Sequence, residues 1–306
     1  MGSKKSFAVF VAALIVFSAA FLANGKSEDQ SESESYEKRT EVFNPYIERP
    51  EPSLGGIREY TVIAQDMPHE VYPGVFMEGW TLNGTIPGPT FTAIEGETVK
   101  IKFVNNGARP TTLHFHGVHE LKYDGVHEVV NPGKSYVYEL TTEPPGMYIY
   151  HSHAGSIDKT DNQGFFGAYL VYPKVPLPPA KEIVMLQQVI DTDGEAEEAE
   201  FYAFNGRADY YMNNPIEISV NETIRIYLSN INIEFALFHI HANVFREYDP
   251  LGFNREKYIL NDNAGNGWGQ RKILEFSYST PGLYMFHDHI GEHLGEGMRG
   301  WFKVTE

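Results

Sequence analysis

Apolar and polar residues alternate along most of the chain, in short runs that end at turn residues. A period of two places apolar side chains on one face of an extended strand and polar side chains on the other. Gly, Pro and Asn at the ends of the runs favour tight turns, and no long amphipathic helix interrupts the series. The pattern predicts β-strands within residues 58–65, 97–106, 134–142, 146–153, 167–173, 216–220, 222–230, 272–280 and 282–289.

The two halves of the chain repeat the same motifs. The segment TTLHFHGVH at residues 111–119 corresponds to FALFHIHANVF at residues 235–245. In the same way, PPGMYIYHSHAGS at residues 144–156 corresponds to TPGLYMFHDHIGE at residues 280–292. Repetition of this kind indicates duplication of one structural unit.

A Pro-rich stretch, YPKVPLPPAKE at residues 172–182, divides the chain into two similar lengths. Proline-rich segments act as semi-rigid spacers, so this stretch is the expected linker. A chain of 306 residues is long enough for two domains that each bury a core. We therefore predict an all-β protein of two tandem β-sandwiches, with domain 1 at residues 57–175 and domain 2 at residues 176–306.

The N-terminus has the pattern of an export sequence. Lys4 and Lys5 precede an apolar run at residues 7–23, and small residues follow it. We predict a signal peptide or a membrane anchor over residues 1–25, since about 20 apolar residues also suffice to span a bilayer. A flexible acidic and Ser-rich tether is expected over residues 26–56. Either form of the leader predicts a secreted or extracytoplasmic protein.

Composition narrows the chemistry. The formal charge of −17 argues against binding to nucleic acid or anionic lipid, which both require a basic surface. The chain contains no cysteine, which excludes disulfides, thiolate catalysis and thiolate-bound metal. Any metal must therefore be held by histidine, carboxylate or methionine.

Eight of the twelve histidines fall into four His-x-His pairs. Residues two apart on a strand share a face, so each pair presents two imidazoles side by side. Burying so many imidazoles without a metal or a charged partner would be costly. Imidazole suits several transition metals, but a hydrolytic zinc site usually has about three protein ligands. Eight imidazoles indicate a polynuclear copper site formed by His114, His116, His151, His153, His239, His241, His287 and His289.

From about Thr61 to the C-terminus, the sequence resembles two-domain multicopper oxidases of the laccase-like cupredoxin family. The motifs LHFHG, YHSH, FHIH and FHDH carry the resemblance, together with NGTIPGPTFTAIEGETVKI. It implies two Greek-key cupredoxin domains and a trinuclear cluster of about three copper ions per subunit, one type 2 copper and a type 3 pair. By the same resemblance His114 and His239 hold the type 2 copper, and the other six histidines hold the type 3 pair.

Asp124, in the KYDG segment, matches an acidic residue that family members place near the type 2 copper. A carboxylate there can orient water and pass protons to the reaction. The same Asp-Gly pair is also typical of a simple turn. Both interpretations stay open from the sequence.

The last motif departs from the family. Its usual sequence is His-Cys-His, in which the cysteine binds the type 1 copper that collects electrons, but this chain has Asp288. His293 and Met298 stand at two further type 1 ligand positions, whereas Ala236 replaces the other histidine and Ser152 fills the middle position in domain 1. Type 1 copper is therefore expected to be absent, with Asp288 bonded to backbone or an imidazole to hold the flanking histidines.

Loss of the electron entry site predicts weak or absent oxidation of bulky phenolic donors. We expect an oxidoreductase that acts directly on a small substrate, namely dioxygen, a small nitrogen oxide or hydroxylamine. The alternative is a copper-binding protein that buffers or delivers the metal without turnover. The resemblance further implies a homotrimer in which domain 1 of one subunit meets domain 2 of its neighbour. The substrate and the electron-transfer partner stay unassigned.

Overall fold

The computed structural model describes residues 39–192 and 199–306, and these residues are arranged almost entirely in β-strands. The predicted leader at residues 1–25 lies outside the described range. The short helices are η1 (Leu54–Gly56), η2 (Leu121–Tyr123), α1 (Ile157–Asn162), α2 (Tyr210–Asn213) and α3 (Gly291–Gly295). None of these helices has the length and apolar character needed to cross a membrane.

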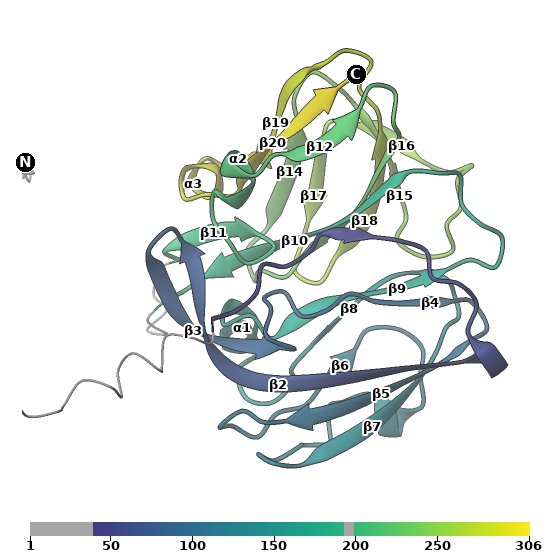
Figure 1. The fold of residues 1–306 in the computed structure, drawn as a ribbon, viewed down its shortest axis with the longest axis vertical. Helices are drawn as coiled ribbons and strands as arrows, with labels where there is room; N and C mark the ends of the chain where they lie inside the picture. Colours follow the sequence, from purple (N-terminus) through teal and green to yellow (C-terminus); the bar gives the residue numbers. More distant parts are fainter. Residues whose placement is uncertain (1–38, 193–198) are drawn as a thin grey trace, which may run out of the picture. The chain divides into compact units, whose positions relative to one another are not determined.

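The first domain consists of two four-stranded sheets. The strand order of one sheet is β3 (Val75–Leu82), β2 (Ile57–Tyr72), β5 (Thr98–Asn105), β7 (Ser135–Thr141). The order of the other is β4 (Phe91–Ile94), β9 (Phe166–Tyr172), β8 (Gly146–His151), β6 (His114–Phe115). These strands are coloured purple to teal in Figure 1.

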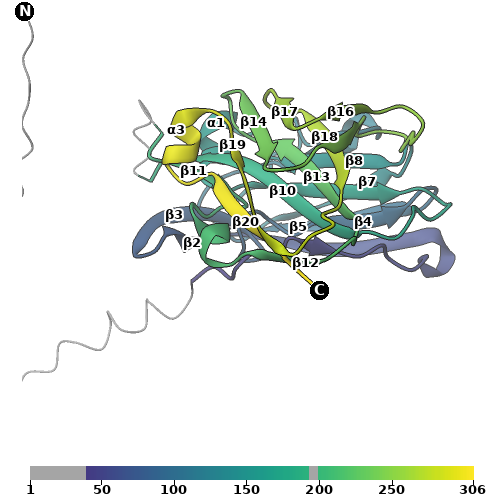
Figure 2. The same ribbon diagram turned by 90° about the horizontal axis from the view of Figure 1, so that it is seen from above.

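The second domain also consists of two sheets, coloured green to yellow apart from β1 (Figures 1 and 2). One follows the order β1 (Tyr46–Ile47), β10 (Lys181–Ile190), β13 (Ile224–Asn230), β18 (Arg271–Phe276), β15 (Phe245–Tyr248), β16 (Ile259–Asn261), and β11 (Phe201–Phe204) also pairs with β10. The other has the order β12 (Ile216–Ser219), β20 (Arg299–Thr305), β19 (Gly282–Asp288), β14 (Ala236–Ile240), β17 (Asn263–Asn266).

Strand directions repeat between the two domains. β2 pairs with β5 in parallel in the first domain, as β10 pairs with β13 in the second. Likewise β4 runs parallel to β9, and β12 runs parallel to β20. The predicted fold class, two tandem cupredoxin-like Greek-key sandwiches, is confirmed.

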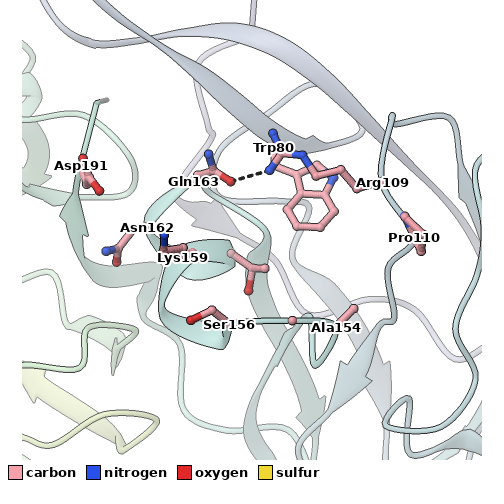
Figure 3. Close-up of a pocket in the computed structure, with 11 residues that line it drawn as sticks. Trp80, Arg109, Pro110, Ala154, Ser156, Lys159, Asn162, Gln163 and Asp191 are labelled. Atoms are coloured by element: carbon pink, nitrogen blue, oxygen red, sulfur yellow. Dashed lines mark hydrogen bonds between the residues drawn. The ribbon is translucent and has the colours of Figure 1, made fainter. Parts of the chain in front are cut away.

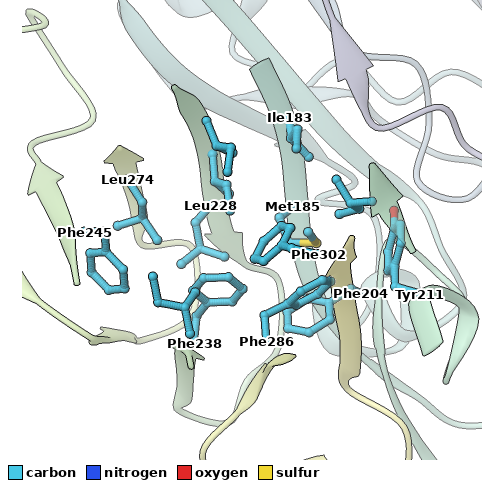
Figure 4. Close-up of a cluster of buried hydrophobic side chains, with 14 of the residues drawn as sticks. Ile183, Met185, Phe204, Tyr211, Leu228, Phe238, Phe245, Leu274, Phe286 and Phe302 are labelled. Carbon is cyan, nitrogen blue, oxygen red and sulfur yellow. The ribbon is translucent and has the colours of Figure 1, made fainter. Parts of the chain in front are cut away.

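Each sandwich encloses its own apolar core, and a third buried cluster joins the two sandwiches. The core of the second domain is rich in aromatic side chains, among them Phe204, Phe238 and Phe286 (Figure 4). The joining cluster combines Ile149 and Phe166 of the first domain with many side chains of the second. It includes Val184, Leu186 and Ile190 of β10, a strand that alternation did not reveal because almost all its residues are covered. The two sandwiches therefore form one packed unit.

The tether expected over residues 26–56 requires correction for its second part. Residues 26–38 lie outside the described range. Phe43, by contrast, is buried in the joining cluster, and β1 pairs antiparallel with β10. Burial of Phe43 and the pairing of β1 hold this segment against the second domain. The Ser/Glu-rich composition further upstream did not indicate this packing.

Buried Arg225 is the centre of an ion-pair network in the second domain. Its Nε donates to Glu275 Oε1 at 2.6 Å, and its Nη1 donates to Glu182. Arg255 also donates to Glu275, with 2.7 Å between Nη2 and Oε2. Burial alone would raise the pKa of Glu275, but the bonds from Arg255 and Arg225 outweigh it and lower that pKa.

Replacing Arg225 with Met should lower the free energy of unfolding by about 3–5 kcal/mol, because buried Glu275 loses a charged partner. Urea denaturation measures the change. The matched control is Lys303→Met, which removes an exposed ion pair with Glu217 and should change stability by about 1 kcal/mol or less. Equal effects of the two substitutions would contradict a structural role for the Arg225 network.

His69 links the N-terminal segment to both domains. Its Nε2 donates to the carbonyl oxygen of Gly206 at 2.7 Å, so its Nδ1 accepts from the Thr40 hydroxyl at 2.9 Å. Both nitrogens are thus satisfied in the neutral ring. Burial lowers the pKa of His69 to about 4.

This depressed pKa makes stability dependent on pH. Between pH 6.5 and 4 the unfolded chain binds a proton at His69 that the folded chain does not, so stability falls as pH falls through that window. We expect the copper-free wild type to lose about 3 kcal/mol more across this window than a His69→Gln variant. Urea denaturation at several pH values gives both slopes, and identical slopes would show that His69 is not responsible.

Candidate metal centre

The first group of histidines lies where β6 meets β8. His114 on β6 is directly opposite His151 on β8 in the antiparallel register. His116 and His153 each follow two residues later, so all four rings gather at one edge of the sheet. His114 contacts the other three, with ring centroids 4.5 Å from His153 and 5.2 Å from His116.

The second group repeats this arrangement where β14 meets β19. His239 is directly opposite His287 in the register, and His241 and His289 follow two residues after them. Ring centroids of His239 lie 5.0 Å from His241 and 5.0 Å from His289. We call the two groups half-site 1 (His114, His116, His151 and His153) and half-site 2 (His239, His241, His287 and His289).

Backbone carbonyls orient His114 and His239, the first histidines of the first His-x-His motif in each domain. His114 Nδ1 donates to the carbonyl oxygen of Asp124 at 2.5 Å, and His239 Nδ1 donates to that of Asp262 at 2.7 Å. A carbonyl can only accept, so each Nδ1 carries the proton. Each Nε2 is consequently left with a lone pair for a metal ion.

Backbone carbonyls also orient His151 and His287, the first histidines of the second motif in each domain. His151 Nδ1 lies 3.1 Å from the carbonyl oxygen of Ser152, and His287 Nδ1 lies 2.7 Å from that of Asp288. Their Nε2 atoms in turn face the Nε2 atoms of His116 and His241, at 3.1 and 3.0 Å. Two nitrogens about 3 Å apart can both reach one ion at ordinary metal-nitrogen bond lengths of about 2.0 Å.

Electrostatics favour the neutral, ligand-competent imidazoles. Burial, reinforced by neighbouring histidines, lowers the pKa of His116 to about 3 and that of His151 to about 4. Burial also lowers the pKa values of His153, His241 and His287. A set of neutral imidazoles with fixed tautomers fits copper, which nitrogen ligands bind tightly.

The two half-sites are separate from each other in the described part of the chain. Three histidines of half-site 1 and three of half-site 2 form separate groups whose ligand atoms lie within 4.8 Å of one another. Across residues 39–192 and 199–306, histidine ring contacts occur within a half-site and none joins the two. His241 and His289 are exposed to solvent. Half-site 2 is thus an open surface of imidazoles.

Asp124 lies beside half-site 1. Its Oδ1 accepts from His119 Nε2 at 2.9 Å and lies 3.5 Å from His114 Nδ1. Burial would raise the pKa of Asp124, but the bond from His119 and the nearby histidines lower it on balance. The turn requires Gly125, because its φ is +72° and a Cβ would lie 2.1 Å from the carbonyl oxygen of Leu113. The Asp-Gly pair therefore forms a turn, and this turn places the Asp124 carboxylate beside His114.

Two further histidines, His119 and His127, follow the first motif in the sequence but differ in their surroundings. The side chain of His119 is covered and bonds to Asp124. His127 is exposed and belongs to neither half-site. The Asp124 carbonyl that orients His114 was not foreseen, because nothing in the sequence marks a carbonyl acceptor.

Asp288 is fully buried between two histidines of half-site 2. Its Oδ2 accepts from the Leu237 amide at 2.8 Å and from Gln187 Nε2 at 2.9 Å. Its Oδ1 accepts from the Ile290 amide at 2.9 Å. These bonds tie β19 to β14 and to β10, confirming that Asp288 bonds to backbone. Ser152 occupies the corresponding position between two histidines of half-site 1, and its hydroxyl accepts from the Ala154 amide.

His293 is buried between two carboxylates. Its Nδ1 lies 3.3 Å from Asp288 Oδ1, and its Nε2 lies 3.1 Å from Glu234 Oε2. The ring also stacks on Tyr202 with centroids 4.0 Å apart. Burial would lower the pKa of His293, but Asp288 and Glu234 raise it overall. Both nitrogens thus face acidic side chains where the resemblance would place a type 1 ligand.

Known proteins similar to most of this chain include multicopper oxidases, both in sequence comparison and in structure comparison. Two sequence profiles, both described as multicopper oxidase, match residues 65–176 and 177–306. A solved structure described as a multicopper oxidase is 36% identical with a TM-score of 0.80, and the match covers 84% of this chain and 94% of that one.

The names of two curated relatives include nitrite reductase. A probable nitrite reductase-hydroxylamine oxidoreductase fusion protein of Kuenenia stuttgartiensis is 31% identical over 280 residues, which cover 79% of this chain but 31% of the fusion protein. The copper-containing nitrite reductase of Neisseria gonorrhoeae is 27% identical over 284 residues, which cover 85% of this chain and 71% of that protein.

Replacing Asp288 with Asn should lower the free energy of unfolding by about 1–3 kcal/mol. An amide offers one acceptor oxygen where the carboxylate offers two, so a buried N–H group of Leu237 or Ile290 loses its partner. Denaturation of the copper-free protein measures the loss. Asp249→Asn, at an exposed aspartate, should change stability by about 0.5 kcal/mol or less. A wild-type stability for Asp288→Asn would contradict this account.

Proposed function

The chain belongs to the multicopper oxidase family, and we propose that it is an extracytoplasmic copper oxidoreductase without type 1 copper that acts directly on a small substrate. Membership of the family implies copper as the metal. One observation carries the proposal: two complete four-histidine half-sites are present in a chain that contains no cysteine. The usual thiolate route for electrons is therefore lacking, while the ligands of the cluster are retained.

We propose that half-site 1 of one subunit and half-site 2 of its neighbour hold a trinuclear cluster. The separation of the half-sites and the solvent exposure of His241 and His289 support this assembly. A head-to-tail contact between different surfaces closes into a ring, and the family resemblance favours a ring of three. In this proposal His114 and His239 share the type 2 copper, and the other six histidines hold the type 3 pair.

The substrate class follows from access. A donor that cannot use a type 1 copper must react at the cluster, which favours small molecules over bulky phenols. The relatives named for nitrite reduction favour a small nitrogen oxide or hydroxylamine, and dioxygen fits the family as a whole. Copper bound there would supply reversible one-electron chemistry to the substrate.

We propose that Asp124 and His119 handle protons for this chemistry. Reduction of nitrite or dioxygen consumes protons, which a carboxylate beside the cluster can hold and transfer. Asp124 Oδ1 is oriented by His119 and faces the His114 ring. His119 is the positioning residue in this arrangement, because it contacts Asp124 and not a metal ligand.

Copper content with electron paramagnetic resonance and turnover of nitrite, hydroxylamine and dioxygen tests the proposed function. We expect about three copper ions per subunit, a type 2 signal, no intense blue band and turnover of at least one small substrate. His289→Ala should abolish that copper content, while His127→Ala, an equally exposed histidine outside the half-sites, should preserve it. Full copper loading without any turnover would favour the alternative of copper buffering or delivery.

Replacing Asp124 with Asn should lower kcat about 100-fold or more while copper content stays near the wild-type value. The carbonyl that orients His114 is retained in this variant, so only the carboxylate is lost. Asp262→Asn is the matched control, because Asp262 gives its carbonyl to His239 but its side chain bonds only to Asn263 among the described residues. Equal losses in both variants would show that Asp124 has no special part in proton transfer.

A further inference from the structure

A cavity of about 560 Å3 opens beside the segment that follows His153 (Figure 3). Ala154, Gly155 and Ser156 form one wall, and helix α1 forms another. The described residues that line it are Trp80, Arg109, Pro110, Ala154, Gly155, Ser156, Lys159, Thr160, Asn162, Gln163 and Asp191. Neither half-site contributes a ligand to this cavity.

Two cationic side chains, Arg109 and Lys159, line this cavity, although the protein as a whole is strongly acidic. Arg109 stacks on the Trp80 ring at 5.2 Å and donates from Nη1 to Gln163 Oε1 at 2.8 Å. The Gln163 carbonyl in turn accepts from the Trp80 amide at 2.8 Å, which ties the end of α1 to β3. Arg109 is therefore held in place by neutral groups, and most of its five N–H donors stay free for a ligand.

Lys159 is the second cation, exposed at the cavity wall. Among the described side chains, no carboxylate forms an ion pair with Arg109 or with Lys159, although many other cations of the chain do have such partners. Asp191, the one acidic residue among the described residues of the lining, lies across the cavity from Arg109 in Figure 3. The end of the cavity near Arg109 thus favours negative charge.

The walls indicate what kind of anion fits. Pro110 and Ala154 line the cavity with accessible apolar surface, whereas Trp80 is only 3% exposed and serves mainly as the ring on which Arg109 stacks. A volume of about 560 Å3 lies in the range of pockets for organic ligands and far exceeds what one inorganic anion fills. A planar guanidinium also matches the two oxygens of a carboxylate.

We propose that this cavity binds a small organic carboxylate, with its carboxylate on Arg109 and Lys159 and its apolar body against Pro110 and Ala154. This site goes beyond the proposed function and needs no copper. Its wall begins at the residue after His153, so the ligand lies next to the chain segment that carries half-site 1.

Calorimetric titration of copper-free protein with benzoate tests the site, and benzyl alcohol is the neutral probe of similar shape. We expect saturable binding of benzoate and at least about tenfold weaker binding of benzyl alcohol. Arg109→Gln should weaken benzoate binding about tenfold or more, and Lys159→Gln about threefold or more. Because Lys159 is exposed, its variant keeps the test valid if loss of Arg109 disturbs folding.

The matched control is Arg246→Gln. Arg246 stacks on Tyr258 at 5.4 Å, as Arg109 stacks on Trp80, but it lies outside the cavity, so benzoate binding should stay within about twofold of wild type. Absence of benzoate binding, equal binding of benzyl alcohol, or unchanged binding in both cavity variants would overturn the proposal. Displacement of benzoate by equimolar inorganic phosphate would overturn the organic class of ligand.

Discussion

The antiparallel register between two pairs of strands sets the geometry on which the metal centre depends. His114 opposite His151, and His239 opposite His287, place the four central imidazoles on neighbouring strands. Because side chains alternate along a strand, a slip of one residue would turn every ligand into the core and bring Phe115 or Phe286 outward. The two apolar cores hold the register, and backbone carbonyls then fix which nitrogen faces outward in these four rings.

Half-site 2 keeps this geometry although it lacks the cysteine of the family motif. A buried carboxylate is tolerated at Asp288 because two backbone amides and Gln187 satisfy it. His293 is enclosed by Asp288, Glu234 and Tyr202 in the same region. Hydrogen bonds between strands thus occupy the position at which the family resemblance would place type 1 copper. These hydrogen bonds hold the strands at their spacing, so all four histidines of half-site 2 stay side by side.

Much of the site could be predicted because its signals are local. Residues two apart on a strand share a face, so the His-x-His pairs and the repeat of motifs indicated both half-sites. The missing cysteine at Asp288 was equally visible. Other features depend on tertiary contacts that leave no local pattern. Strand β10 lost its alternation because its second half is buried on both faces. The partners of Arg225 lie 43 and 50 residues away, and Arg109 meets Trp80 only through folding.

We propose that one copy of the chain completes the metal centre of another. Co-expression of His116→Ala chains, defective in half-site 1, with His289→Ala chains, defective in half-site 2, tests it most directly. In randomly mixed rings, about a quarter of the contacts pair an intact half-site 1 with an intact half-site 2. The account predicts that copper content and the copper resonance signal recover to about that fraction of wild type, while each variant alone has neither. Co-expressed chains with no more copper than either single variant would contradict it.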